Sequence, residues 1–364
     1  MEEMQPEEPT GARPEAPPEV ATPEATSEVS PEAPPETTST NGEYSDQELL
    51  ECAQELKRLF DELGELYPER THLMNQLLFA LLTREHVLVH GMYGTAKTAL
   101  ANAVFQSFDS QVTFAVQLTK FMTEANVIGV PDPRIMREEG VIFYRPEGQI
   151  LEANFAELDE FFDANSPLLR TMLGVLNERE FKRGRQYEKA KLHTAIASTN
   201  GEPDAVIKQS PELGAIIDRF IFRCKIEYLQ SPASRLKMYK NFAAGKRPTV
   251  HIDYKKLESL SDLVLNRIPV DDDTLLRTYD QALTVYKQRM QGQVVSDRRA
   301  CKLLNLMRAS AVLNGRLQVI LADIRAVRWG LCIGNDKNHH DTFDYYAKPI
   351  IDNAIAAASA QAQQ

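Results

Sequence analysis

The sequence predicts an α/β fold with a mostly parallel central sheet, followed by a small all-helical domain. Two patterns predict it. Up to about residue 230, short apolar runs that fit buried strands alternate with helical periodicity, which is typical of an α/β sandwich with a parallel sheet. After that point the pattern becomes almost entirely helical, chiefly at 254–266, 273–290, 297–312 and 321–331. The 364 residues suffice for about two or three domains.

The first 40 residues differ in composition from the rest of the chain. They hold ten Glu and nine Pro, a single basic residue (Arg13) and no aromatic residue. Such a segment buries too little apolar surface to offset the entropy of ordering it. We therefore expect residues 1–42 to be a disordered, solubilising tail, with partner docking as the alternative. Most of the formal charge of -11 lies in this tail, so the rest of the chain is nearly neutral.

The composition and the cysteine spacing indicate where in the cell the protein is found. The start of the chain lacks the charged-then-apolar pattern of a secretory signal, and no apolar run approaches the ~18 residues that span a bilayer. The cysteines are far apart and form no Cys-x-x-Cys pair, which favours reduced thiols over a disulfide framework or a zinc site. We expect a cytoplasmic protein. The cysteines are Cys52, Cys224, Cys301 and Cys332.

The ordered elements are predicted to begin near Ser45. Ser45 and Glu48 form a capping box before a helical apolar pattern, and Pro68 opens a second helix. The run 86–90 fits a buried parallel strand. It continues into a glycine-containing loop and a helix over 99–108. Further strands are predicted at 112–118, 141–144, 154–158, 192–198 and 220–226.

The loop over residues 91–98 has the features of a phosphate-binding loop. In such loops, backbone N–H groups and a helix N-terminus converge on phosphates. The glycines permit that backbone path, Lys97 supplies a charge to the β- and γ-phosphates, and Thr98 offers a hydroxyl to Mg²⁺. Ala96 stands where the general pattern has glycine, and a chance turn before a helix is the alternative. The predicted ATP-binding residues are Gly91, Met92, Tyr93, Gly94, Thr95, Ala96, Lys97, Thr98 and Ala99.

Two acidic residues follow the predicted strand 154–158. Asp159 at the carboxyl end of a central strand can hold Mg²⁺, and Glu160 can polarise the attacking water. The alternative is a solvated acidic helix start, because Glu157 and Asp163 lie nearby.

Three further polar residues are candidates for the same chemistry. Asn200 follows a predicted strand and can orient water near the γ-phosphate, although alone it would be an ordinary turn residue. Arg219 can reach the nucleotide of a neighbouring subunit, with a surface salt bridge as its alternative. Arg298 lies near a helix N-terminus, where a cation opposes the helix dipole, and contact with the nucleotide would explain it.

In combination, these motifs resemble the MoxR group of AAA+ ATPases. The resemblance covers roughly residues 45–332, and the alanine at 96 is typical of that group. The stretches 118–122, 158–167 and 176–181 are similar to the RavA-like branch. Tyr93 and Phe161 depart from the usual Pro and Ile. The motifs are Gly-x-x-Gly-x-Ala-Lys-Thr at 91–98, Leu-Asp-Glu at 158–160, Ala-Ser-Thr-Asn at 197–200, Asp-Arg-Phe at 218–220 and Ser-Asp-Arg-Arg at 296–299.

The resemblance implies roles for the candidate residues. Lys97 and Thr98 would be Walker A, and Asp159 and Glu160 Walker B. Asn200 would be sensor 1, Arg219 the arginine finger and Arg298 sensor 2. Residues 125–150 would form the helix-2 insert and 180–192 the pre-sensor hairpin. The parts would be a tail over 1–42, an AAA+ nucleotide-binding domain over 43–230, a helical lid over 231–335 and a helical extension over 336–364.

The implied function is Mg²⁺-dependent ATP hydrolysis by a ring, commonly a hexamer, that remodels a partner protein. Proteins with a von Willebrand factor A domain are frequent partners in this group. The alternative is an AAA+ motor acting on nucleic acid, but only Lys182, Arg183 and Arg185 form a tight basic cluster. A nucleotide-gated scaffold is disfavoured by Glu160. The run 339–341, His-His-Asp, is interpreted as an exposed loop, with a metal site as the alternative.

Overall fold

The structure is a computed structural model that describes residues 44–361, except 204, 206–207, 209–212 and 291–294. The predicted tail over residues 1–42 lies outside the described residues. A compact unit over residues 43–364 holds all the elements that follow.

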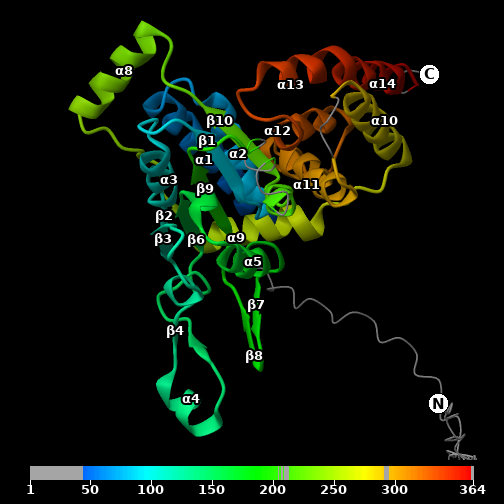
Figure 1. The fold of residues 1–364 in the computed structure, drawn as a ribbon. Coiled ribbons are helices and arrows are strands. Elements are labelled where there is room, and N and C mark those ends of the chain that lie inside the picture. The colour runs from blue at the N-terminus through cyan, green and yellow to red at the C-terminus, as the bar shows by residue number, and fades with distance from the viewer. Residues whose placement is uncertain (1–43, 204, 206–207, 209–212, 291–294, 362–364) are drawn as a thin grey trace, which may run out of the picture. The chain divides into compact units, whose positions relative to one another are not determined.

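Five parallel strands form the central sheet, in the order β10-β1-β9-β6-β3. Because all their carboxyl ends meet at one edge, the loops that follow them gather there. This arrangement confirms the predicted α/β fold with a parallel sheet (Figure 1). The strands are β1 (Val87–Gly91), β3 (Thr113–Gln117), β6 (Phe155–Asp159), β9 (Thr194–Thr199) and β10 (Phe222–Ile226).

Helices cover both faces of the sheet, as the alternation of side chains along the strands requires. Val87 and Val89 belong to one buried cluster, with α1 (Asp46–Leu66), α2 (Thr71–Thr83), α3 (Lys97–Phe105) and α9 (Tyr254–Asp262). Leu88, between them, belongs to the opposite cluster, with α5 (Ser166–Leu173) and the π-helical turn η3 (Gly174–Glu178). Short helical turns complete this region: η2 (Phe161–Asp163), α7 (Gly214–Ile217) and η5 (Leu263–Arg267).

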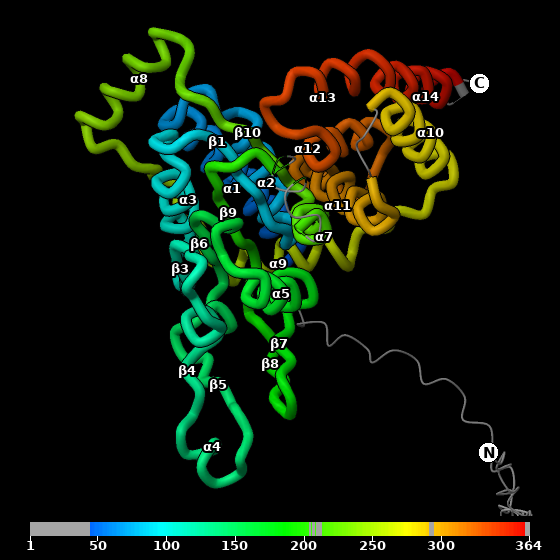
Figure 2. The backbone as a smooth tube through the Cα atoms, viewed as in Figure 1, coloured from blue at the N-terminus to red at the C-terminus, as the bar shows by residue number. Residues whose placement is uncertain are grey.

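Two β-hairpins project from the sheet in the same direction (Figures 1 and 2). One consists of β4 (Val130–Pro131) and β5 (Tyr144–Arg145), with α4 (Pro133–Glu139) between them and η1 (Glu124–Asn126) before them. The other consists of β7 (Glu180–Arg183) and β8 (Gln186–Lys189). The predicted strand over 141–144 is wrong except at its last residue. The partner segment continues only to Asp132, whose N–H donates to the Phe143 carbonyl at 2.7 Å, before α4 begins at Pro133.

The chain after the sheet is helical, which confirms the predicted helical lid. The predicted helix over 321–331 is helical throughout, as a 3₁₀-helix over 321–327 around the Asp323 carboxylate and an α-helix over 328–331. That carboxylate accepts from the backbone N–H of Ile320 at 2.9 Å. The helices are α10 (Asp273–Arg289), α11 (Asp297–Leu313), η6 (Leu321–Val327), α12 (Arg328–Leu331), α13 (Lys337–Thr342), η7 (Phe343–Ala347) and α14 (Lys348–Gln361).

Residues 232–262 connect the sheet to these helices. The helix α8 (Pro232–Ala243) has no buried residue, whereas β11 (Ile252–Asp253) pairs with β2 (Phe108–Asp109). The helix α9 packs against α1 and α2. The predicted border at residues 230 and 231 stays a prediction.

The two adjacent histidines at 339 and 340 lie inside the protein. His339 and His340 are buried in α13, at 6% and 7% exposure, so the exposed-loop interpretation is wrong. The His340 ring packs against that of His72, with 4.4 Å between ring centroids and a tilt of 33°. Among the described residues, no group of three metal-ligating side chains occurs. In the same part of the chain, every helix is too short or too polar to cross a bilayer.

Candidate functional site

The loop after β1 has backbone requirements that only certain residues satisfy. A Cβ atom at Gly91 would lie 2.2 Å from the carbonyl oxygen of Ile226 on β10, so only glycine fits there. Ala96 has φ 65° and ψ 33°, directly before the first residue of α3. This left-handed conformation explains why the general motif has glycine at that position. Alanine adopts it at a cost of about 1–2 kcal/mol.

Lys97 points back into the loop and across to β9. Its ammonium nitrogen lies 2.8 Å from the carbonyl oxygen of Gly91, 3.2 Å from that of Met92 and 2.8 Å from Oδ1 of Asn200. Partial burial lowers the pKa of Lys97, and the carboxylates of Glu160 and Asp159 oppose that shift. The loop therefore fixes the Lys97 ammonium group at the carboxyl edge of the sheet.

The two acidic residues that follow β6 differ in conformation. Asp159 ends the strand, and its Oδ1 accepts from the Ser198 hydroxyl and, at 3.1 Å, from the backbone N–H of Glu160. Glu160 is left-handed, with φ 51° and ψ 48°, a conformation uncommon for a residue other than glycine. Burial raises the pKa of Glu160, and the nearby carboxylates of Asp159 and Asp163 raise it further. Asp159 and Glu160 are therefore not simply solvated acidic residues at the start of a helix, because Asp159 is hydrogen-bonded and Glu160 is partly buried.

Asn200 connects the loop to the acidic pair. Its Oδ1 accepts from Lys97, and its Nδ2 donates to Oε1 of Glu160. The structure thus brings together three residues that lie 103 and 40 positions apart in the chain. A cation, an amide and a carboxylate form one hydrogen-bonded chain at the sheet edge.

A cavity of about 760 Å³ adjoins the loop. Its lining includes Thr95, Ala96 and Ala99 of the loop and α3, Tyr67 from the end of α1, and Phe242 of α8. The Tyr67 hydroxyl donates to the carbonyl of Ala99 at 3.1 Å, which fixes one wall. Its volume lies in the range of about 300–1,000 Å³ typical of small-molecule sites. The sequence did not indicate this cavity, because its walls come from segments far apart in the chain.

The two arginine candidates lie away from this edge. Arg219 precedes the start of β10, whereas the loop follows the far end of neighbouring β1, about 13 Å away along a strand of this length. Arg298 lies in the first turn of α11, and the next residue, Arg299, donates to the carbonyl of Ile221 directly before β10.

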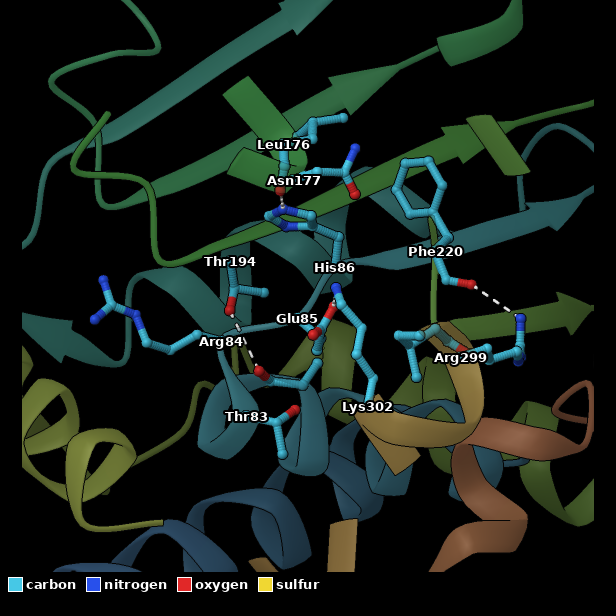
Figure 3. Close-up of polar contacts among 12 residues, drawn as sticks. Thr83, Arg84, Glu85, His86, Leu176, Asn177, Thr194, Phe220, Arg299 and Lys302 are labelled. Carbon is cyan, nitrogen blue, oxygen red and sulfur yellow. Dashed lines mark hydrogen bonds and ion pairs between the residues drawn. The ribbon is translucent and has the colours of Figure 1, made fainter. Parts of the chain in front are cut away.

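The amino edge of the same sheet holds a polar network that sequence reasoning missed (Figure 3). Nδ1 of His86 accepts from the backbone N–H of Ala195 at 2.9 Å, and Nε2 lies 2.5 Å from the carbonyl of Leu176. Arg179 contacts that carbonyl and, at 3.0 Å, the carbonyl of His193. Burial keeps the pKa of His86 well below its usual value, and the Arg179 cation adds to the shift.

The lid joins this network through α11. Lys302 donates to Oε2 of Glu85 at 2.8 Å, and the buried Arg299 donates to the carbonyl of Ile221 at 2.9 Å. Burial raises the pKa of Glu85 and lowers that of Arg299 to about 9. These groups bond to one another and to the backbone. The network therefore links the lid helix α11 to the central sheet and has a structural role.

The strand order, the loop between β1 and α3 and the polar residues after β6 and β9 define a P-loop ATPase fold of the AAA+ class. The comparisons with known families agree. Residues 54–262 match the family described as the MoxR domain in the MoxR-vWA-beta-propeller ternary systems, and residues 277–343 match an AAA lid domain. The chain belongs to the MoxR family of AAA+ ATPases.

Individual proteins are similar to the chain at lower identity. Two uncharacterised proteins of Methanocaldococcus jannaschii are each 26% identical, over 76% and 75% of this chain and 70% of their own lengths. Chaperone MoxR1 of Mycobacterium tuberculosis is 28% identical over 51% of this chain and 48% of its own length. A putative ATPase from Cytophaga hutchinsonii has a TM-score of 0.61 at 18% identity, covering 85% of this chain and 96% of that one. This last likeness shows the fold.

Proposed function

We propose that the chain hydrolyses ATP in a Mg²⁺-dependent reaction at the carboxyl edge of its sheet. The observation that carries the proposal is the hydrogen-bonded chain from Lys97 through Asn200 to Glu160. It places a cation suited to phosphate beside a carboxylate suited to a water molecule, with an amide holding both. Family membership supports the same activity.

The residues at this edge fit ATP and Mg²⁺. Hydroxyl and carboxylate oxygens, supplied by Thr98 and Asp159, are the ligands that Mg²⁺ prefers. The loop between Gly91 and α3 would hold the phosphates by backbone N–H groups and a helix N-terminus. When bound, the metal supplies charge neutralisation at the phosphates. Glu160 would polarise the water, and Asn200 would orient it.

Arg219 is proposed to act on the nucleotide of a neighbouring subunit in a ring, which we propose to be a hexamer. One of its guanidinium amines donates to the carbonyl of Ala215 at 2.6 Å. Its Nε is buried and has no hydrogen-bond partner among the described residues. The distance along β10 keeps it from the loop of its own chain, so a neighbouring site is the natural target. Contact of Arg298 with a nucleotide stays a prediction.

The biological role is proposed to be chaperone-like remodelling of a partner protein in the cytoplasm. The matching family is described from systems that combine MoxR and von Willebrand factor A proteins, and one similar protein is named a chaperone. These descriptions support a protein client, such as a von Willebrand factor A domain protein. A closer relation to the RavA-like branch stays a prediction.

A nucleic-acid motor remains the second hypothesis from the sequence, and charge pairing weakens it. In the β7–β8 hairpin, Lys182 forms an ion pair with Glu180 and Arg183 forms one with Glu124. Paired cations attract phosphate backbones less than free ones.

Phosphate release by the full-length protein tests the proposed function. Release should require Mg²⁺ and should rise per molecule with protein concentration as rings form. Arg219→Ala and Glu160→Gln should each be inactive alone, and mixing them should restore partial activity at interfaces with one intact Glu160 and one intact Arg219. An ATPase that stays monomeric and concentration-independent would exclude the shared site. No release under any condition would exclude hydrolysis.

A further inference from the structure

Arg219 lies between two points at which the lid helix α11 is bonded to the chain. It follows Asp218, the C-cap of the short helix α7, and precedes Phe220 and the start of β10. The Arg219 side chain donates to the carbonyl of Ala215 in the preceding turn. The direction of the guanidinium therefore depends on what holds the backbone before and after it.

The residue before Arg219 is bonded to the N-cap of the lid helix. The Ser296 hydroxyl donates to Oδ2 of Asp218 at 3.0 Å, and the Ser296 oxygen accepts from the backbone N–H of Arg299 at 3.2 Å. Ser296 is therefore both the N-cap of α11 and a donor to Asp218. The carboxylate is also favoured there by the helix dipole. The contact links two segments 78 positions apart in the chain.

The residues after Arg219 are bonded to the same helix. The Arg299 guanidinium donates to the carbonyl of Phe220 at 3.4 Å and to that of Ile221 at 2.9 Å (Figure 3). It also donates to the carbonyl of Gly330 in α12. Arg299 is only 2% exposed. A buried guanidinium that bonds three carbonyls is costly to displace, because those bonds would be lost.

The lid helix thus holds the backbone on both sides of Arg219. The two contacts differ in burial, since Arg299 is buried whereas Asp218 and Ser296 are partly exposed. The buried contact fixes the start of β10, and the partly exposed one fixes the turn from α7 into that strand. Because Arg219 occupies this turn, loss of the contact between Asp218 and Ser296 would redirect its side chain without opening the core.

We propose that Asp218 is a positioning residue for Arg219: its hydrogen bond with Ser296 fixes the direction in which the arginine faces the neighbouring subunit. The inference rests on the proposed function, in which Arg219 acts on a neighbour's nucleotide. A guanidinium stabilises a transition state best when it is held in place before the reaction. The lid of one subunit thereby orients the arginine that serves the site of the next subunit.

Turnover and ATP affinity of the full-length protein separate positioning from stability. Asp218→Ala should lower kcat about 10–100-fold, the scale of a misplaced catalytic group. It should leave the affinity for a fluorescent ATP analogue unchanged, because the phosphate-binding loop of the same chain is intact. Asp297→Ala removes a carboxylate from the exposed residue next to Ser296 and should keep the parent kcat. Equal kcat losses in the two variants, or the parent kcat in Asp218→Ala, would overturn the inference.

Two replacements of Ser296 keep the N-cap of α11 and differ in the bond to Asp218. Ser296→Thr keeps the hydroxyl donor, whereas Ser296→Asp keeps an acceptor for α11 but repels the Asp218 carboxylate. Both residue types cap helices well, so α11 should stay folded. Ser296→Thr should turn over near the parent rate, and Ser296→Asp should lose as much as Asp218→Ala. Equal rates in the two Ser296 variants would contradict the inference. Should Asp218→Ala fail to fold by circular dichroism, this pair decides.

Mixed rings show which side of the subunit interface is impaired. Asp218→Ala mixed with Glu160→Gln should be more active than either alone, because some sites then pair an intact Glu160 with an intact Arg219 segment. Asp218→Ala mixed with Arg219→Ala should show no recovery, because both defects lie on the same side. Recovery in the second mixture, or none in the first while Arg219→Ala with Glu160→Gln recovers, would overturn the inference. Arg219→Ala at the parent rate would instead refute the proposed role of Arg219, and a parent protein without ATPase activity would refute the proposed function.

Discussion

The two edges of the central sheet use polar residues in opposite ways. At the carboxyl edge, Lys97, Glu160 and Asn200 are partly or fully exposed and bond to one another beside a cavity. At the amino edge, His86 and Glu85 are buried, with partners from the chain itself. Polar and charged side chains therefore form an accessible site at one edge of the sheet and a buried structural network at the other.

The difference lies in which segments meet at each edge. The carboxyl edge consists of loops that follow strands, where backbone irregularities such as Ala96 and Glu160 occur. Strained backbone of this kind is frequent at functional sites. The amino edge is covered by η3, which Arg179 directly follows, and by the lid helix α11, which contains Lys302. Replacements of these residues at the two edges should therefore affect different properties: activity at the first and stability at the second.

The largest effect is expected at Glu160. Glu160→Gln should lower the turnover number about 10²–10⁴-fold, because a neutral amide cannot polarise water as a carboxylate does. Affinity for ATP should change less than threefold. Asp163→Asn, which removes the same charge nearby on an exposed residue, is the matched control and should stay near the parent rate. A Glu160→Gln protein with the parent rate would remove Glu160 from the mechanism.

Arg179 should have the largest effect on stability. Arg179→Met removes donors to the carbonyls of Leu176, Arg84 and His193. The free energy of unfolding in urea should fall by about 3–5 kcal/mol, because three buried carbonyls lose a donor. Arg183→Met, at an exposed residue that ends the adjoining strand β7, should cost less than about 1 kcal/mol. Equal costs at both sites would contradict the comparison.

Acid should weaken the fold through the buried histidines of the amino edge. Burial holds the pKa values of His86 and His193 well below their usual range. The unfolded chain then binds more protons below about pH 6.5, so stability is complete above that pH and falls below it. Between pH 7.5 and 5.5 the two residues should cost roughly 2–3 kcal/mol. His193→Gln should flatten this slope in urea titrations, and a slope unchanged by that replacement would exclude the role of His193.

The smallest effect concerns the strained residue of the loop. Ala96→Gly should stabilise the fold by up to about 1 kcal/mol, since glycine adopts positive φ without strain but is more flexible when unfolded. Ala96→Val should be destabilising, because a β-branched residue disfavours that conformation. Thermal melting of both variants measures the difference. Equal melting temperatures would mean that the φ of 65° stores no strain.

Much of the carboxyl edge could be predicted because its residues follow strands that the sequence shows as apolar runs. Lys97, Asp159 and Asn200 each come directly after or shortly after such a run. Parallel strands bring their carboxyl ends together, so the proximity follows from the fold class.

The amino edge and the contact between Asp218 and Ser296 could not be predicted in the same way. His86 was placed within a strand, and Arg179 and Lys302 belong to no motif; their meeting depends on how η3 and α11 pack on the sheet. Asp218 and Ser296 each belong to a predicted motif, but nothing in the sequence relates the two motifs to each other. Their hydrogen bond becomes visible only when α11 is packed beside the start of β10.

The comparison of the two edges is tested most directly by replacing one lysine at each. Lys97→Ala and Lys302→Ala both remove an ammonium group with a side-chain partner 2.8 Å away, Asn200 in one case and Glu85 in the other. The measurement is the affinity for a fluorescent ATP analogue in Mg²⁺, at a temperature where both variants are folded. Lys97→Ala should lose about 100-fold in affinity, the scale of a lost charged hydrogen bond of ~3 kcal/mol, and Lys302→Ala should bind within twofold of the parent protein. Equal losses in both variants, or a loss confined to Lys302→Ala, would contradict the account.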